Sequence, residues 1–372
     1  MKQLKILVII VVGVSLLFIS HAVHAKVTGS CANCHTMHNS QNGTEVVTDP
    51  QPALTVNNCV GCHSSTDSDP TYELGDSTVP VVYNTNGAST YLAGGNFYWV
   101  AAGDDTKGHN IFSDNPDALS TAPGGSWGTG CDTNSCHNNL HTTYNDGPNP
   151  GLDGRQGCTK CHMVDDQYGP SGFHHADDSN IVVGSELNDQ DGYYRFLKGH
   201  QSADDRGVSG IEDNDWQYTR SSTDHNEYLG KQNALKSKGG LGNLDNTMTG
   251  YCCGCHGDFH GQNEKDDGSG NWIRHPSDAV IPSQVEYANA FGAAGTGEGT
   301  YNPLVPVARP SLSVVKGTVA LGTDLVMCLS CHRPHGSPYS DMLRWDYENM
   351  IAGGGGADGT GCFVCHTNKD GS

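Results

Sequence analysis

The sequence is poor in apolar side chains and in positive charge. Only 35% of its 372 residues are hydrophobic, and 41 acidic residues face 20 basic ones, for a formal net charge of −21. This acidic balance argues against nucleic acid or an anionic membrane as a binding partner. A chain with so few apolar residues struggles to bury a core made of side chains alone. Another group must therefore supply the core.

Long apolar runs are confined to the start of the chain. Lys2 and Lys5 flank the start of an apolar run at 6–19, and the small residues that end at Ala25 resemble a cleavage site. This pattern predicts a secretory signal peptide over residues 1–25 and a mature chain of 26–372. A retained anchor is the alternative, although the run falls short of the roughly 20 residues that span a bilayer. We expect a secreted, cell-surface protein with no membrane span in the mature chain.

The sequence is rich in cysteine and histidine, with 15 and 19 residues. Fourteen cysteines form seven pairs, each followed directly by histidine, which is the attachment pattern of c-type haem. The two thioethers reach one edge of a porphyrin, and the next residue places its imidazole under the iron. Six pairs are Cys-x-x-Cys-His, whereas the third pair along the chain is stretched, with four residues between its cysteines. The predicted attachment residues are Cys31, Cys34, Cys59, Cys62, Cys131, Cys136, Cys158, Cys161, Cys252, Cys255, Cys328, Cys331, Cys362 and Cys365, and the proximal iron ligands are His35, His63, His137, His162, His256, His332 and His366.

Zinc sites and disulfides also use paired cysteines in exported proteins. Neither requires a histidine after every pair. A local disulfide is the main rival reading for the stretched motif. Cys253, inside "CCGCH", is the odd cysteine, and we expect it to be a buried or free thiol. The sequence therefore predicts seven covalently attached haems c.

Ten histidines remain after the two in the leader and the seven in the motifs are set aside. Because ten candidates exceed seven irons, histidine can occupy the second face of every iron, and three of the ten must be solvated or structural. Irons with both faces occupied favour electron transfer over substrate chemistry. The candidate second ligands are His38, His109, His141, His174, His175, His225, His260, His275 and His335, with His200 as the tenth histidine.

Glycine and other turn-forming residues punctuate nearly every stretch of the chain, with 49 glycines in all. This pattern predicts a mostly irregular fold with short α-helices around a haem-chain core, forming one continuous domain over 26–372. We expect the motifs on single helical turns and a longer helix over 340–352, capped by Ser340 or Asp341. Acidic loops at 177–180 and 188–192 suggest calcium, with solvated loops as the alternative.

Several stretches resemble a known family. They include "CHTMHNSQ" near the N-terminus, "YCCGCHGDFH" followed by "RHPSD", and "CLSCHRPHGSPYSDMLRWDY". These are similar to the OmcE- and OmcS-like outer-surface multihaem c-type cytochromes of metal-respiring bacteria. The resemblance implies bis-histidine haems in near contact, and several members polymerise into extracellular conductive filaments. In polymerising relatives the second histidine of "CHTMH", here His38, caps a haem in the neighbouring subunit. The implied partners are identical subunits, other cytochromes and metal oxides.

Three functions remain open at this point. The first is an extracellular electron conduit without enzymatic activity, and the second is a multihaem reductase of the nitrite or hydroxylamine type. The third is a periplasmic or outer-surface electron shuttle that does not polymerise. A reductase needs one iron with an open face, often marked by an altered motif, and all seven motifs here end in histidine. The sequence therefore favours electron transport.

Overall fold

The computed structural model describes residues 29–48, 54–86, 91–112, 122, 140–141, 157–162, 174, 181–182, 193–197, 207–232, 244–256, 275–293, 295–352 and 359–367. Several sequence predictions lie outside these residues: the signal peptide, the stretched motif Cys131/Cys136/His137, His175, His200, His260 and both acidic loops. No helix in the described part of the chain is long and apolar enough to cross a membrane.

Regular structure is sparse, as predicted, and the longest described α-helix, α5, has 6 residues. The α-helices are α2 (Cys59–Cys62), α3 (Tyr98–Ala101), α4 (Met248–Cys252), α5 (Val285–Ala290) and α6 (Cys328–Cys331). The 3₁₀ turns are η1 (Cys31–Asn33), η3 (Asp105–Lys107), η4 (Gly157–Lys160), η6 (Tyr194–Phe196), η9 (Ser340–Met342), η10 (Tyr347–Asn349) and η11 (Gly361–Val364). The strands are β1 (Ser40–Gln41), β2 (Thr44–Glu45), β3 (Ser64–Ser65), β4 (Thr71–Leu74), β5 (Ser77–Pro80), β6 (Tyr83–Asn84), β7 (Ile181–Val182), β8 (Gly210–Ile211), β9 (Glu227–Leu229), β10 (Glu298–Thr300), β11 (Ala308–Arg309) and β12 (Thr318–Ala320).

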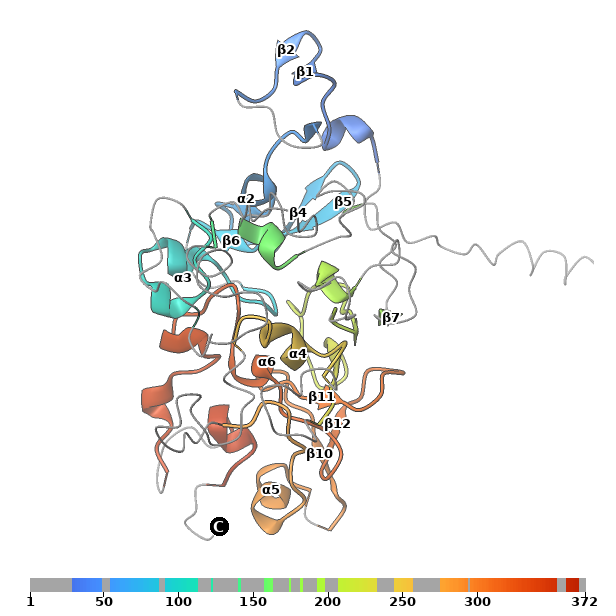
Figure 1. Ribbon diagram of the computed structural model, residues 1–372, viewed down its shortest axis with the longest axis vertical. Helices are drawn as coiled ribbons and strands as arrows, with labels where there is room; N and C mark the ends of the chain where they lie inside the picture. The colour runs from blue at the N-terminus through green and yellow to red at the C-terminus, as the bar shows by residue number, and fades with distance from the viewer. Residues whose placement is uncertain are drawn as a thin grey trace, which may run out of the picture.

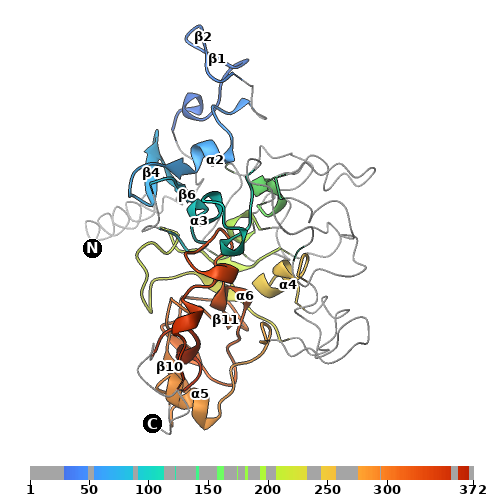
Figure 2. The same ribbon diagram turned by 90° about the vertical axis from the view of Figure 1, so that its left-hand side faces the viewer.

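The strands form small separate sheets. Strands β1 and β2 make one antiparallel hairpin, and β4 and β5 make another, in which Tyr72 pairs with Val79. The largest described sheet has four strands in the order β11-β9-β8-β7, with β11 parallel to β9. The β1–β2 hairpin projects from one end of the molecule, and α5 and the C-terminus lie at the opposite end (Figures 1 and 2). The first attachment motif is therefore carried on an extension.

Among the described residues, apolar side chains gather in separate clusters rather than in one large core. One cluster packs Tyr194, Tyr228 and Met248 beside the four-stranded sheet. A second surrounds Phe291 and Tyr301 near the C-terminal end. Clusters of this size agree with the expectation that the protein chain alone supplies little of the core.

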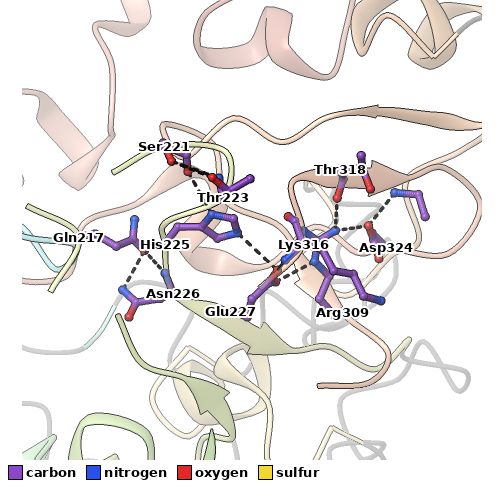
Figure 3. Close-up of polar contacts among 11 residues, drawn as sticks. Gln217, Ser221, Thr223, His225, Asn226, Glu227, Arg309, Lys316, Thr318 and Asp324 are labelled. Atoms are coloured by element: carbon purple, nitrogen blue, oxygen red, sulfur yellow. Dashed lines mark hydrogen bonds and ion pairs between the residues drawn. The ribbon is translucent and has the colours of Figure 1, made fainter. Parts of the chain in front are cut away.

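A buried ion network ties the largest sheet to the strands beside it (Figure 3). Arg309 on β11 is 1% exposed, and its Nε donates to Oε2 of Glu227 at 2.8 Å. Its Nη1 also binds the Asp324 carboxylate. The Lys316 amide donates to the same Glu227 at 2.7 Å. Each charged group in the network has hydrogen-bond partners, which is a condition for keeping ions in a protein interior.

The predicted helix over 340–352 is wrong. Asp341 has a left-handed backbone (φ 58), and only the turns η9 and η10 form in this region. The segment gives its backbone hydrogen bonds to the sixth attachment motif instead. The Arg333 amide donates to the Met342 carbonyl and the Arg344 amide to the Cys331 carbonyl, both at 2.8 Å. Tertiary pairing with the motif thus replaces the helix that local propensity favours.

Candidate functional site

The six described attachment motifs share one backbone turn. In each motif the histidine amide donates to the carbonyl of the first cysteine, at 2.8 Å for His35, His63 and His162 and at 2.9–3.1 Å for the others. Asn58 caps the second motif by accepting from the Gly61 amide at 2.7 Å. The prediction that the motifs occupy single helical turns is confirmed for these six. The described cysteines form no disulfides.

The second ring nitrogen of several motif histidines is fixed by a backbone carbonyl. Nδ1 lies 2.9 Å from the Pro80 carbonyl in His63, 2.7 Å from Arg195 in His162 and 2.7 Å from Asp341 in His332. A carbonyl can only accept, so Nδ1 carries the proton and Nε2 keeps its lone pair for a metal. Metal-bound histidines in proteins are held in this way.

Two of these carbonyls belong to residues in a strained conformation. Arg195 and Asp341 have φ angles of 47° and 58°, in the left-handed region that non-glycine residues rarely adopt. Each turn aims its carbonyl at the Nδ1 of a motif histidine. Strain of this kind is typical of sites that must be held in place by the fold. The sequence does not predict these carbonyl contacts, because every residue has a backbone carbonyl and no side chain marks the ones that are used.

Four motif histidines each face a histidine from outside the motifs. The ring centres of His63 and His174 are 6.1 Å apart, and those of His162 and His335 are 5.9 Å apart. Two metal–nitrogen bonds of about 2 Å, with about 1 Å from each nitrogen to its ring centre, separate two ring centres by about 6 Å. The remaining two pairs are His256 with His109 at 6.1 Å and His366 with His275 at 6.3 Å.

The histidines outside the motifs are also held in place. Nδ1 of His109 lies 2.9 Å from the Pro334 carbonyl, which fixes its tautomer. The His335 amide donates to the Gly94 carbonyl at 2.8 Å, and its ring stacks on Phe97 at 4.6 Å. Gly94 is required there, because an added Cβ would lie 2.9 Å from Nδ1 of His335. The loop that carries Pro334 and His335 thus positions two candidate ligands, His109 and His335.

Burial keeps the candidate ligands neutral. Removal from water lowers the pKa of His335 to about 3 and that of His109 to about 4, and it also lowers the pKa of His63, His162 and His332. The neutral imidazole is the form with a lone pair for a metal. At neutral pH these rings therefore offer nitrogen donors without first losing a proton.

These observations test whether the chain fits haem c. Within the described residues no three His, Cys, Asp or Glu side chains converge on one point, as a zinc site would require. Two imidazoles with ring centres 5.9–6.3 Å apart and a nearby cysteine pair instead match an iron held in a porphyrin plane. The donor set therefore fits haem c at the second, fourth, fifth and seventh motifs.

His225 lies in a different environment. Its ring is fully buried and stacks on Tyr301 at 3.7 Å, and its Nε2 is 3.4 Å from Oε1 of Glu227 (Figure 3). Its Nδ1 lies 3.1 Å from the Ser221 carbonyl. Both nitrogens thus lie near protein groups, and the ligand role of His225 stays a prediction.

The other predicted residues occupy varied positions. His38 is exposed on a turn, and His141 is half-buried with its Nδ1 lacking a hydrogen-bond partner among the described residues. Cys253 is buried, and its Sγ donates to the Thr249 carbonyl at 2.8 Å, as expected for a packing thiol. The ligand roles of His38 and His141 stay predictions.

The chain was compared with known proteins. The family of the doubled CXXCH motif matches residues 322–371, which hold the sixth and seventh motifs. The C-type cytochrome OmcS of Geobacter sulfurreducens is 24% identical, and the match covers 87% of this chain and 80% of that protein. Two solved structures also match. The Outer Membrane Cytochrome S Filament from Geobacter sulfurreducens is 20% identical, with a TM-score of 0.48 over 87% of this chain and 85% of that one. The OmcS nanowires from Geobacter sulfurreducens, seen by cryo-EM, are 22% identical, with a TM-score of 0.49 over 90% and 88%. The doubled motif at one end and the sequence similarity along most of the length show that the chain is similar to the C-type cytochrome OmcS.

Proposed function

We propose that this protein is secreted and carries electrons outside the cell through seven covalently attached haems, each held by two histidines. The four opposed histidine pairs at 5.9–6.3 Å are the observation that carries this proposal. When bound, haem supplies reversible one-electron chemistry. Two histidines per iron leave no position open for a substrate, so transport is favoured over catalysis.

The chain's own residues hold and tune these sites. Carbonyls of Pro80, Arg195 and Asp341 accept from the motif histidines, which raises the basicity of the coordinating nitrogen. Partial burial of the His63, His162 and His332 rings reduces the access of water to these ligands. Both effects favour fast, repeated electron exchange without ligand loss.

We further propose that copies of the chain assemble head to tail through His38. His38 and Asn39 both have left-handed backbones, with φ angles of 54° and 61°, and form the tip of a tight turn closed by the Ser40 amide and the Met37 carbonyl at 2.9 Å. His38 is exposed, and Met37 beside it is 75% exposed. An exposed imidazole and an exposed apolar side chain in the turn just before a projecting hairpin are suited to an intermolecular contact.

His332 supplies the complementary site for this assembly. Its Nδ1 is bound to the Asp341 carbonyl, and none of the histidine ring pairs at 5.9–6.3 Å among the described residues includes it. We propose that His38 of one copy completes the ligand pair at the His332 iron of the next. A contact between two different surfaces of identical chains repeats without closing, and so it yields a filament.

The variant His38→Asn tests this assembly, because asparagine tolerates the left-handed turn and removes the imidazole. We expect loss of filaments in electron micrographs and one high-spin haem per chain. Added imidazole should restore the low-spin spectrum without restoring filaments. Thr44→Ala, on the exposed strand β2 of the same hairpin, is the matched control and should behave as wild type. Normal filaments with unchanged spectra in His38→Asn would contradict the proposal.

A further inference from the structure

The described attachment motifs touch one another through their cysteines. The motifs are numbered one to seven along the chain. The Cys59 side chain of motif two lies beside that of Cys158 in motif four. The thiol of Cys252 in motif five likewise meets that of Cys328 in motif six. Each of these contacts joins the first cysteines of two motifs.

The second cysteine of a motif faces a different neighbour. The carbonyl of Cys34 in motif one accepts from the Val56 amide at 2.8 Å, just before motif two, and Cys34 interacts with Cys62. The carbonyl of Cys161 in motif four accepts from the Tyr251 hydroxyl at 2.6 Å, directly before motif five. Motifs two and four thus each have one cysteine toward the preceding neighbour and one toward the following neighbour.

The same order continues to the C-terminal end. Cys331, the second cysteine of motif six, interacts electrostatically with Cys362 and Cys365 of motif seven. Contacts between histidines agree with the cysteine contacts. His63 of motif two interacts with His162 of motif four, and His335 interacts with both. Motifs two and four are therefore neighbours at their sulfur atoms and at their iron ligands.

From these contacts we infer that the conducting row runs through motifs one, two, four, five, six and seven, with motif two passing electrons directly to motif four. The stretched motif Cys131/Cys136/His137 is therefore not a required link. This inference rests on the proposed electron-transfer function. Because the first cysteines of motifs two and four are neighbours, a third porphyrin cannot separate these two attachment points. One electron moves at each step, the donor site being oxidised as the acceptor site is reduced, and no co-reactant is consumed.

The double variant Cys131→Ala/Cys136→Ala tests this order, with Cys158→Ala/Cys161→Ala as the matched control. Intact mass under denaturing conditions should show that each variant has lost one haem. We expect conduction through protein films of the first variant to stay within about twofold of wild type, and that of the control to fall by at least about tenfold. An equal loss in both variants would overturn the inference.

Two further measurements keep the test decisive. If wild-type protein does not conduct, the proposed function fails, and the exciton signal in Soret circular dichroism then decides the haem order. This signal from the contacting haems two and four should persist without motif three and weaken without motif four. Its loss from the Cys131→Ala/Cys136→Ala variant would contradict the inference. If the Cys158→Ala/Cys161→Ala variant does not accumulate, His137→Met tests the haem order instead. This substitution changes the reduction potential of haem three. Conduction should slow if haem three is a required link and stay unchanged if it is not.

Discussion

The imidazole rings of His162 and His335 lie 5.9 Å apart, although one belongs to the fourth attachment motif and the other follows the sixth. The same long-range pairing occurs between His109 and His256. Each bound iron would therefore connect distant segments of the chain, as a covalent cross-link would. In a protein with small apolar clusters, these connections make the cofactor part of the fold as well as part of the conduit.

Replacing His335 with alanine should open one face of the iron held by His162. We expect one high-spin haem per chain in electron paramagnetic resonance, together with new carbon monoxide binding after reduction. Wild-type protein with all faces occupied should bind no carbon monoxide. His225→Gln is the control, because His225 contacts Tyr301 and Glu227 rather than a motif histidine, and it should keep every haem low-spin. A high-spin haem in the control would identify His225 as a ligand.

Arg309→Met should destabilise the protein strongly. The change leaves the carboxylates of Glu227 and Asp324 buried without their cation, and breaking a buried ion pair from one side costs about 3–5 kcal/mol. Denaturant unfolding measures the loss. Lys316→Met is the matched control, because Lys316 binds Glu227 through its backbone amide, which the substitution keeps. Equal stability of the two variants would show that the network is not required.

The sequence predicted the attachment sites but not the pairing of their ligands. Cys-x-x-Cys-His is a local pattern, and its turn forms from hydrogen bonds within five residues, so motifs such as Cys59–His63 are readable directly. The partner of His162 is set by loop packing around Gly94, which no spacing rule predicts. The helix expected at 340–352 failed for a related reason, since the carbonyl of Asp341 is used to orient His332. Tertiary demands of the sites overrode local propensity there.

Asp213 should make the protein less stable as the pH rises. Burial, followed by the neighbouring Asp215, raises the pKa of Asp213 from 3.8 to about 6. A raised carboxyl pKa means that the folded state favours the protonated form. Protonated Asp213 therefore contributes to the free energy of unfolding below about pH 4, and this contribution is lost as the pH passes 6. Asp213→Asn should therefore be more stable than wild type at pH 7, by about 1 kcal/mol after allowance for solvent screening.

The pH dependence of this difference is the critical readout. The melting temperatures of wild type and Asp213→Asn should converge near pH 4 and separate toward pH 7. Asp215→Asn should behave differently, because hydrogen bonds from Thr219 hold the pKa of Asp215 below its usual value against the effect of burial. A constant difference across this pH range would contradict the assignment to Asp213.

Folding should depend on haem attachment. Small apolar clusters and buried polar groups leave most of the core to the porphyrins, so the chain made without the attachment machinery should be unfolded and quickly degraded. Far-ultraviolet circular dichroism and limited proteolysis check this. The holoprotein should carry seven haems by denatured mass, and a mass that fits six would remove the stretched motif from the count.

Electron cryo-microscopy of the secreted native protein would show both the assembly and the ligands of each iron. We expect head-to-tail filaments in which each iron lies between two histidines, with His162 opposite His335 and His38 of one copy opposite His332 of the next. The haem anchored at Cys59 and Cys62 should adjoin the one anchored at Cys158 and Cys161. Separate monomers, or an iron with an open face, would contradict the account.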